Sequence, residues 1–377
     1  MRWAGRSRPC STSNPNKAHP MFKRLSRALG VALLCAIGLA VFLLLKPVPT
    51  TVDPIQPRPD TRYWVMPGGY RIAWTRIPAP GGATKPPVIF LHGGPGGYVH
   101  SAIIGALAPL STDGRDVYLY DQSGTGLSDR RERPKDTTIA THLQDLEVIR
   151  ARIGADRVVL VGHSFGGLLA ALYAAEHPDR IERLVLSSPG ALEPASFDAD
   201  GRAATDRLYP VPANLRFTPP TGYVEATAGE NMPVRARASF VLAQLFDIKF
   251  APDREMDAAV DTMASEFTRT MVCDPAHVRP EEGGAGTYSR VGTNFYPDDF
   301  EDRRPAMRRM TAPVLVLQGQ CDFISYGDAY EYAATFPDAR YRFMPGAGHI
   351  IWWDRPDAYS GAIRAFLASD PATQSED

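Results

Sequence analysis

The hydrophobic positions divide the chain into an N-terminal apolar segment and a longer region of short alternating elements. From about Tyr63, runs rich in β-branched and aromatic residues alternate with stretches whose apolar residues recur at helical spacing. The pattern predicts strands at 70–77, 88–91, 117–120, 158–161, 184–187, 314–318 and 339–343, and helices at 138–152, 164–176 and 327–336. The later strands are continuously apolar, which is typical of parallel strands covered on both faces. We therefore expect an α/β fold with a mostly parallel, doubly wound sheet.

The alternation stops after residue 190 and returns near residue 311. The stretch between is rich in Pro, Gly and charged residues, with helical patches at 235–246 and 256–270. Compact domains rarely contain a loop of this length without structure of its own. The sequence therefore predicts a helical cap at 191–310, inserted between two parts of the core at 63–190 and 311–377.

The apolar segment at 28–45 is just long enough to span the hydrocarbon of a bilayer. Lys23, Arg24 and Arg27 precede it, as in the cytoplasmic flank of an anchor or the start of a signal peptide. We expect a basic or disordered segment at 1–27, and both Met1 and Met21 remain possible starts.

No small-x-small cleavage site follows the apolar segment, so we expect an uncleaved anchor with everything downstream outside the cytoplasm. A cleaved signal peptide and a secreted enzyme form the alternative. Residues 46–62 carry five prolines, which favours an extended, semi-rigid linker.

Charge and cysteine content narrow the class of protein. The 41 basic and 42 acidic residues give a net charge of −1, without the basic footprint expected of a nucleic-acid partner. Cys273 and Cys321 lie in the folded part. An oxidising compartment would permit them to pair. The sequence alone does not place their Cα atoms within bridging range, so we expect two unpaired thiols. The cysteines and histidines lack metal-ligand spacing, and we expect no metal or organic cofactor.

The strongest chemical motif is Gly162-His163-Ser164-Phe165-Gly166, which joins the buried strand 158–161 to an alanine-rich helix. A serine hydroxyl is an effective nucleophile only where a sharp turn exposes it to a base. The two glycines remove side chains that would collide with the neighbouring strand and helix. The motif predicts Ser164 as a nucleophile at a helix N-terminus, where the dipole favours negative charge.

A glycine-rich loop, His92-Gly93-Gly94-Pro95-Gly96, directly follows the strand 88–91. In a fold of this kind the loop at this place supplies one backbone donor of an oxyanion hole, and the residue after the nucleophile supplies the other. We expect Gly93 and Phe165 to be these donors, with Gly94 in reserve.

An acid and a base follow the last two strands. Asp322 comes just after the strand 314–318, and His349 lies on a glycine-rich loop after the strand 339–343. Because the carboxyl ends of parallel strands share one sheet edge, both should converge on the nucleophile as triad acid and general base. Asp328 and Asp338 are rival acids, but one falls in a predicted helix and the other precedes a strand.

These motifs together resemble the proline iminopeptidase family of α/β hydrolases. The resemblance rests on the loop at 92–96, the glycine-bearing turn at 121–128 and the order Ser, Asp, His, and it covers roughly residues 63–370. It implies a serine hydrolase that releases an N-terminal residue, often proline, from short peptides, with acidic cap residues holding the free amine. We favour Glu225 and Glu230 for that role, because they flank a glycine-bearing segment before the helix 235–246. The turn at 121–128 either shapes the pocket floor or is simply held by local hydrogen bonds.

Other functions stay open. Position 123 is Ser where the family usually has Arg, and the elbow reads His-Ser-Phe, a form shared with broader aminopeptidases and esterases. An aminopeptidase acting on short peptides leads, and a carboxylester or lactone hydrolase is the alternative. A non-catalytic, membrane-tethered binding module comes last, because it has no need of nucleophile, acid and base in register.

Overall fold

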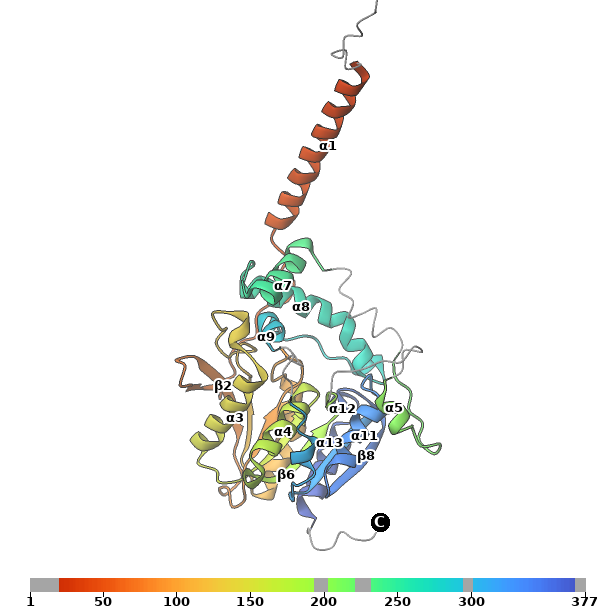
Figure 1. Ribbon diagram of the computed structural model, residues 1–377. Helices are drawn as coiled ribbons and strands as arrows, with labels where there is room; N and C mark the ends of the chain where they lie inside the picture. Colours follow the sequence, from red (N-terminus) through yellow and green to blue (C-terminus); the bar gives the residue numbers. More distant parts are fainter. Residues whose placement is uncertain (1–19, 193–202, 221–231, 294–300, 370–377) are drawn as a thin grey trace, which may run out of the picture. The chain divides into compact units, whose positions relative to one another are not determined.

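The computed structural model describes residues 20–192, 203–220, 232–293 and 301–369. The chain forms two compact units, Met1–Pro47 and Val48–Asp377. The first contains one described helix, α1 (Pro20–Leu45), which Figure 1 draws in red. Its segment Arg27–Leu45, with a mean hydropathy of 2.8, is long and apolar enough to cross a membrane. A signal sequence has the same length and composition, so its membrane role stays a prediction.

The second unit is built on an eight-stranded sheet in the order β1-β2-β4-β3-β5-β6-β7-β8. Strand β2 is antiparallel to both of its neighbours, β1 and β4, and every neighbouring pair from β4 to β8 is parallel. The strands are β1 (Arg62–Val65), β2 (Arg71–Ile77), β3 (Val88–Leu91), β4 (Val117–Tyr120), β5 (Val158–His163), β6 (Ile181–Ser187), β7 (Val314–Cys321) and β8 (Ala339–Gly348). The predicted α/β fold, with its mostly parallel sheet, is confirmed.

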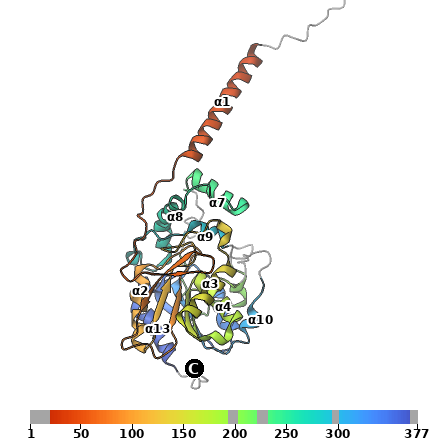
Figure 2. The ribbon, with the colours of Figure 1, turned by 90° about the vertical axis from the view of Figure 1, so that its left-hand side faces the viewer.

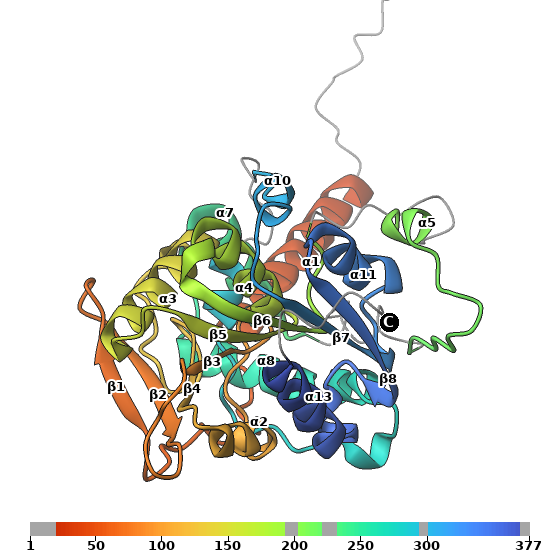
Figure 3. The same cartoon turned by 90° about the horizontal axis from the view of Figure 1, so that it is seen from below.

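Helices cover both faces of the sheet, as Figure 3 shows along its edge. One face carries α3 (Ile139–Ile153), α4 (Phe165–Glu176) and α11 (Tyr326–Thr335), and the other carries α2 (Ser101–Leu107), α12 (Ile351–Asp354) and α13 (Pro356–Ala368). Successive side chains of β5 go to opposite sides: Val158 and Leu160 join one buried cluster, Val159 and Val161 the other. Two-sided burial explains why these strands are continuously apolar.

The predicted strands were found, but several are longer than expected: β6 begins three residues earlier, at Ile181, and β5 ends two residues later, at His163. Strands β3 and β4 have the expected bounds, whereas β7 and β8 extend three and five residues further, to Cys321 and Gly348. Their pairing shifts register between Gly319 and Cys321, which keeps the two strands together beyond the apolar run. The missed β1 is a largely exposed edge strand, so no buried apolar run marks it.

Between the two parts of the core, the described residues form helices and 3₁₀ turns. The helices are α5 (Thr205–Leu208), α7 (Val234–Phe246), α8 (Asp253–Phe267), α9 (Thr287–Gly292) and α10 (Arg304–Met307). The patch predicted at 235–246 corresponds to α7, and α8 begins three residues before the patch predicted at 256. Figures 1 and 2 both show α7 and α8 on the side of the domain away from β6 and α13.

The proline-rich segment does not form the separate stalk that its composition suggested. Val48 is 6% exposed and joins a buried cluster with Ala236, Ala243 and Met256 of the cap helices. Its N–H donates to Glu255 Oε1 at 2.8 Å. The prolines do favour an extended backbone, but the extended segment packs along the cap instead of crossing solvent.

Candidate active site

Ser164 lies at the sharp turn between β5 and α4, as predicted. Its backbone has φ 54° and ψ −122°, a conformation that costs a residue with a side chain on the order of 1–3 kcal/mol. A Cβ at Gly162 would lie 2.2 Å from Gly166 O, and one at Gly166 would lie 2.2 Å from Leu91 O. Only glycine therefore permits the strand and helix to approach this closely, and the turn holds Ser164 at the carboxyl edge of the sheet.

The two expected oxyanion donors flank this serine. Phe165 is the first residue of α4, directly after Ser164. On the other side, a Cβ at Gly93 would lie 2.9 Å from Ser164 Cβ, so the glycine loop passes directly against the serine. Gly94, with φ 132°, turns the loop away towards Gly97. Backbone from two strand ends thus meets at Ser164.

The buried imidazole of His92 holds the glycine loop in place. Its Nε2 accepts the N–H of Gln122 at 2.9 Å, so the proton is on Nδ1, which donates to Gly93 O at 2.9 Å. Burial lowers the pKa of His92 to about 4, which keeps the ring neutral and able to accept. The Gln122 side chain also donates to His92 O at 2.8 Å.

The turn at 121–128 therefore braces the glycine loop. Asp121 accepts the N–H groups of Val99 and Leu127, both at 2.8 Å, and Ser128 Oγ donates to Asp121 O at 2.6 Å. These bonds agree with the expectation of a turn held locally. They add a connection to the loop after β3 that sequence patterns do not reveal.

Asp322 and His349 form a buried pair at the ends of β7 and β8. His349 Nδ1 lies 2.7 Å from Asp322 Oδ1, and their side chains are 2% and 0% exposed. The N–H of Ile324 also donates to Asp322 Oδ1, at 3.0 Å. The hydrogen bond to Nδ1 leaves Nε2 of the imidazole available for a second partner.

The His349 ring lies between two other rings. Its centroid is 4.1 Å from that of Phe323 and 4.7 Å from that of His163, the residue before Ser164. Burial, then the nearby His349, lower the pKa of His163 well below its ordinary value. His163 is consequently uncharged, and its ring packs against the ring of His349.

Neither rival acid is at this position. Asp328 lies in the first turn of α11, where its N–H bonds the capping Ser325 and its carboxylate accepts from Thr205. Asp338 precedes β8, at the end of the strand away from His349. Both were predicted to point elsewhere, and their places in the fold agree.

The expectation of two unpaired thiols was wrong. Cys273 and Cys321 form a disulfide with a Cα–Cα distance of 5.2 Å, inside the bridging range. Because 48 residues separate them, the sequence held no sign of this proximity. The bond ties a cap segment after α8 to the residue before Asp322.

Asp354 connects the same cap segment to the loop of His349. Its carboxylate accepts the N–H of Gly348 at 2.8 Å and of Cys273 at 2.9 Å, and it pairs with His277 Nδ1 at 2.8 Å. The cap segment at 271–277 is therefore fixed to both the loop of Asp322 and the loop of His349.

The cap acids favoured from the sequence, Glu225 and Glu230, lie outside the described residues. The described part of the cap contains two buried aspartates on α8, Asp257 and Asp261, that sequence analysis did not single out. They recur four residues apart with Asp253, and this spacing was the available signal. It is also the spacing of an ordinary solvated helix face.

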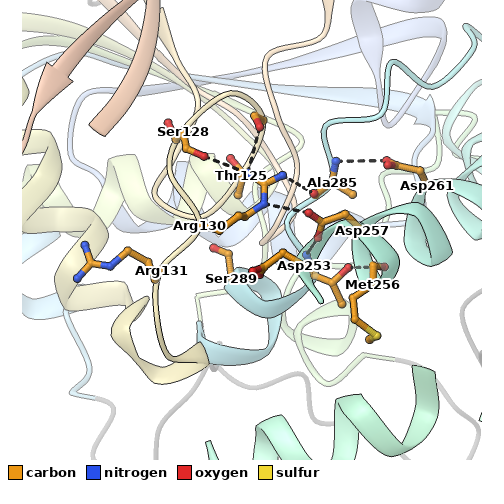
Figure 4. A network of polar contacts seen from close by, with 12 residues as sticks. Thr125, Ser128, Arg130, Arg131, Asp253, Met256, Asp257, Asp261, Ala285 and Ser289 are labelled. Atoms are coloured by element: carbon orange, nitrogen blue, oxygen red, sulfur yellow. Dashed lines mark hydrogen bonds and ion pairs between the residues drawn. The ribbon is translucent and has the colours of Figure 1, made fainter. Parts of the chain in front are cut away.

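Arg130 joins these aspartates to the core (Figure 4). It donates to Asp257 Oδ2 at 2.9 Å, Gly126 O at 3.0 Å and Ala285 O at 3.1 Å. Ala285 N–H in turn donates to Asp261 Oδ1 at 3.2 Å. The network connects α8 with the turn after β4.

Asp261 is the least satisfied of the acids in this network. Its Oδ2 is buried without a hydrogen-bond partner, and burial raises its pKa to about 7. The next backbone link, from Gly286 N–H to Gly96 O at 2.8 Å, reaches the glycine loop. Within the described residues, no group of three or more His, Cys, Asp or Glu is placed to hold a metal ion.

Comparisons with known proteins agree with this architecture. Residues 86–213 match the family model of the α/β hydrolase fold. The proline iminopeptidase of Heyndrickxia coagulans is 25% identical over 80% of this chain and 96% of its own length. The crystal structure of a proline iminopeptidase from Mycobacterium smegmatis has a TM-score of 0.50 at 24% identity, covering 81% of this chain and 97% of that one. An esterase from Exiguobacterium antarcticum has a TM-score of 0.57 at 17% identity, covering 81% and 99%.

The fold, with these relatives, defines the class: the chain is an enzyme, a hydrolase with the α/β-hydrolase fold. Within that class it resembles the proline iminopeptidases, along most of its length and most of theirs.

Proposed function

We propose that the protein is a serine hydrolase in which Ser164 is the nucleophile, His349 the general base and Asp322 the triad acid. The observation that carries the proposal is the buried His349–Asp322 pair at 2.7 Å, on the same sheet edge as the strained turn of Ser164. A catalytic serine needs a base whose tautomer is fixed by a third group, and the acid on Nδ1 supplies this.

The reaction follows from these roles. Ser164 Oγ attacks the substrate carbonyl carbon while His349 Nε2 takes its proton, and the N–H groups of Phe165 and Gly93 stabilise the oxyanion. His349 then gives the proton to the leaving amine as the bond to carbon breaks, which leaves an acyl-enzyme. Water, deprotonated by His349, attacks the ester and releases the acid and Ser164.

We further propose that the preferred substrates are short peptides with a free N-terminus. The support is the likeness to proline iminopeptidases over most of the chain. Such a substrate carries an ammonium group, for which a carboxylate is the natural partner. Glu225 and Glu230 remain candidates from the sequence, and Asp261 joins them because one of its buried oxygens lacks a partner. An ammonium ion there would lower the free energy of the charged carboxylate, which burial otherwise disfavours.

An ester or lactone hydrolase remains the second candidate, because the elbow sequence is shared with esterases and the same triad chemistry serves both. Three matched substrates separate the two: an aminoacyl arylamide, its N-acetyl form and a simple aryl ester. The proposal expects the free-amine arylamide to have the highest kcat/KM. Equal cleavage of the N-acetyl form would contradict an amine site and favour the esterase.

We also propose that α1 anchors the enzyme in a membrane, with the folded unit on the extracytoplasmic side. The basic residues before the apolar segment support this orientation. The disulfide adds independent support, since disulfides persist mainly in oxidising compartments. Protease added to intact cells, after permeabilising any outer envelope, should degrade the folded unit. Complete protection, or recovery in the cytosolic fraction, would contradict the proposal.

A further inference from the structure

Helix α7 has two distinct faces. Ala236, Ser239 and Ala243 are buried against the domain. Val234, Val241 and Leu245 follow at spacings of seven and four residues, which places them on one stripe of the helix, and each is exposed. The stripe therefore points away from the core that its opposite face contacts.

Two more exposed apolar residues, Phe246 and Ile248, lie at the end of α7 and just beyond it, and we call these five residues the apolar patch. Val234, Val241, Leu245, Phe246 and Ile248 are 45%, 50%, 64%, 63% and 51% exposed. They make up five of the nine large exposed apolar residues in the described part of the second unit. Scattered apolar side chains on a surface need no explanation, but a group of this size usually marks an interaction site.

The covalent chain limits what can meet this patch. Val48 lies in the same buried cluster as Ala236 and Ala243 of α7. Only Lys46 and Pro47 separate it from Leu45, the last residue of α1. Three Cα–Cα steps of about 3.8 Å span at most about 11 Å. A helix with its side chains is about 10–12 Å across, so this tether reaches roughly one helix thickness.

From these observations we propose that the apolar patch of α7 docks on the lipid bilayer in which α1 is anchored. The inference rests on the proposed membrane anchor and extends it to a second contact. An anchored α1 keeps Val48 within about 11 Å of the hydrocarbon edge, a gap that one helix layer would fill. Helix α7 contains no acidic residue, and its Arg237 is exposed, which suits an anionic lipid surface, whereas Arg235 is paired with Glu255.

The test uses the full chain in vesicles of phosphatidylcholine and phosphatidylglycerol, with an environment-sensitive fluorophore on a single thiol. Cys10 and Cys35 are replaced by Ala, and the disulfide cysteines remain oxidised. Leu245→Cys reports the patch. Leu208→Cys, at an equally exposed leucine on α5 (72%), is the matched control. A third protein keeps Cys35 and reports α1 itself.

The proposal expects the label at position 245 to be several-fold brighter than at 208, and quenched by lipids that carry a spin label near the headgroup. Quenching at 35 by lipids that carry the spin label deep in the acyl chain, without quenching at 245 by the headgroup-labelled lipids, would overturn the docking and leave the anchor intact. Absence of quenching at both would overturn both. A bright label at 245 that lipids do not quench, and that dims on dilution with lipid, would identify a second copy of the chain as the occupant and reject the bilayer.

Discussion

The catalytic edge of the sheet and the cap differ in what holds their residues in place. Ser164, Asp322 and His349 each follow directly on a parallel strand, so ladders of backbone hydrogen bonds fix all three. In the cap, Asp257 and Asp261 depend on a few individual contacts to Arg130 and to the loop of Ala285. In the proposed mechanism, topology therefore fixes the reacting groups, and separate side-chain contacts determine selectivity.

This difference suggests how changes in the two regions should act. A substitution at the sheet edge removes a group that moves protons or charge, and turnover collapses while the scaffold remains. A substitution in the cap alters which substrate is held, or how firmly the loops are held, with smaller effects. The predictions below run from the largest expected effect to the smallest.

Replacing the nucleophile should give the largest loss. Ser164→Ala is expected to lower kcat on the order of 10⁶-fold, because the remaining groups cannot form an acyl-enzyme. Ser188→Ala is the matched control, since Ser188 is also buried and also has a positive φ, of 45°. Steady-state kinetics should separate the two variants, with similar thermal unfolding in both. Activity retained in Ser164→Ala would move the nucleophile elsewhere.

The triad acid should come next. Asp322→Asn is expected to lower kcat about 10⁴-fold, because an amide stabilises the wrong tautomer of His349 and cannot balance the imidazolium. Asp328→Asn, at a buried acid in the first turn of α11, should keep turnover near that of the wild type. A larger loss of kcat in Asp328→Asn than in Asp322→Asn would identify Asp328 as the acid and contradict the assignment of Asp322.

In the cap, Asp261 should affect selectivity through pH. Burial holds its pKa at about 7, so the carboxylate gains a proton as the pH falls below that value and loses its attraction for an ammonium ion. Between about pH 5 and 7 the α-amino group of a peptide stays charged. The ratio of kcat/KM for the free-amine arylamide to that for its N-acetyl form should therefore fall as pH decreases. The ratio cancels the titration of the triad, which both substrates share.

Asp261→Asn should lower that ratio about tenfold or more at neutral pH, the range for a hydrogen bond to a charged group, and abolish its pH dependence. A ratio that does not change in this variant would reject Asp261 as the amine partner. Glu225→Gln and Glu230→Gln then become the informative variants.

The disulfide should have the smallest effect on rate. Cys273→Ser is expected to lower the free energy of unfolding by about 2–4 kcal/mol, because a 48-residue separation is closed by the bond. We expect kcat to fall only a few-fold, since Asp354 still holds Gly348. Urea unfolding and kinetics should show both changes, and Cys35→Ser should show neither. A reductant should reproduce the change in wild type and have no further effect on Cys273→Ser.

The sequence was most informative where local pattern and topology coincide. Buried strands that end in glycines, an acid or a histidine place Ser164, Asp322 and His349 at one edge without any knowledge of tertiary contacts. The same reasoning could not find the Cys273–Cys321 bond or the contacts of Asp354 with Cys273 and His277, because they join segments far apart in sequence. Composition also misled: the prolines after Leu45 indicate extension, but the burial of Val48 depends on a cluster of cap residues that periodicity does not reveal.

The central claim is tested most directly by mapping the site of a covalent fluorophosphonate adduct. The wild-type chain should carry one phosphonate, on the peptide that contains Ser164, and Asp322→Asn should acquire it far more slowly. Mass spectrometry of the digested protein gives both the residue and the rate. An adduct on any other residue, or one that forms at the same rate in Asp322→Asn, would contradict the account.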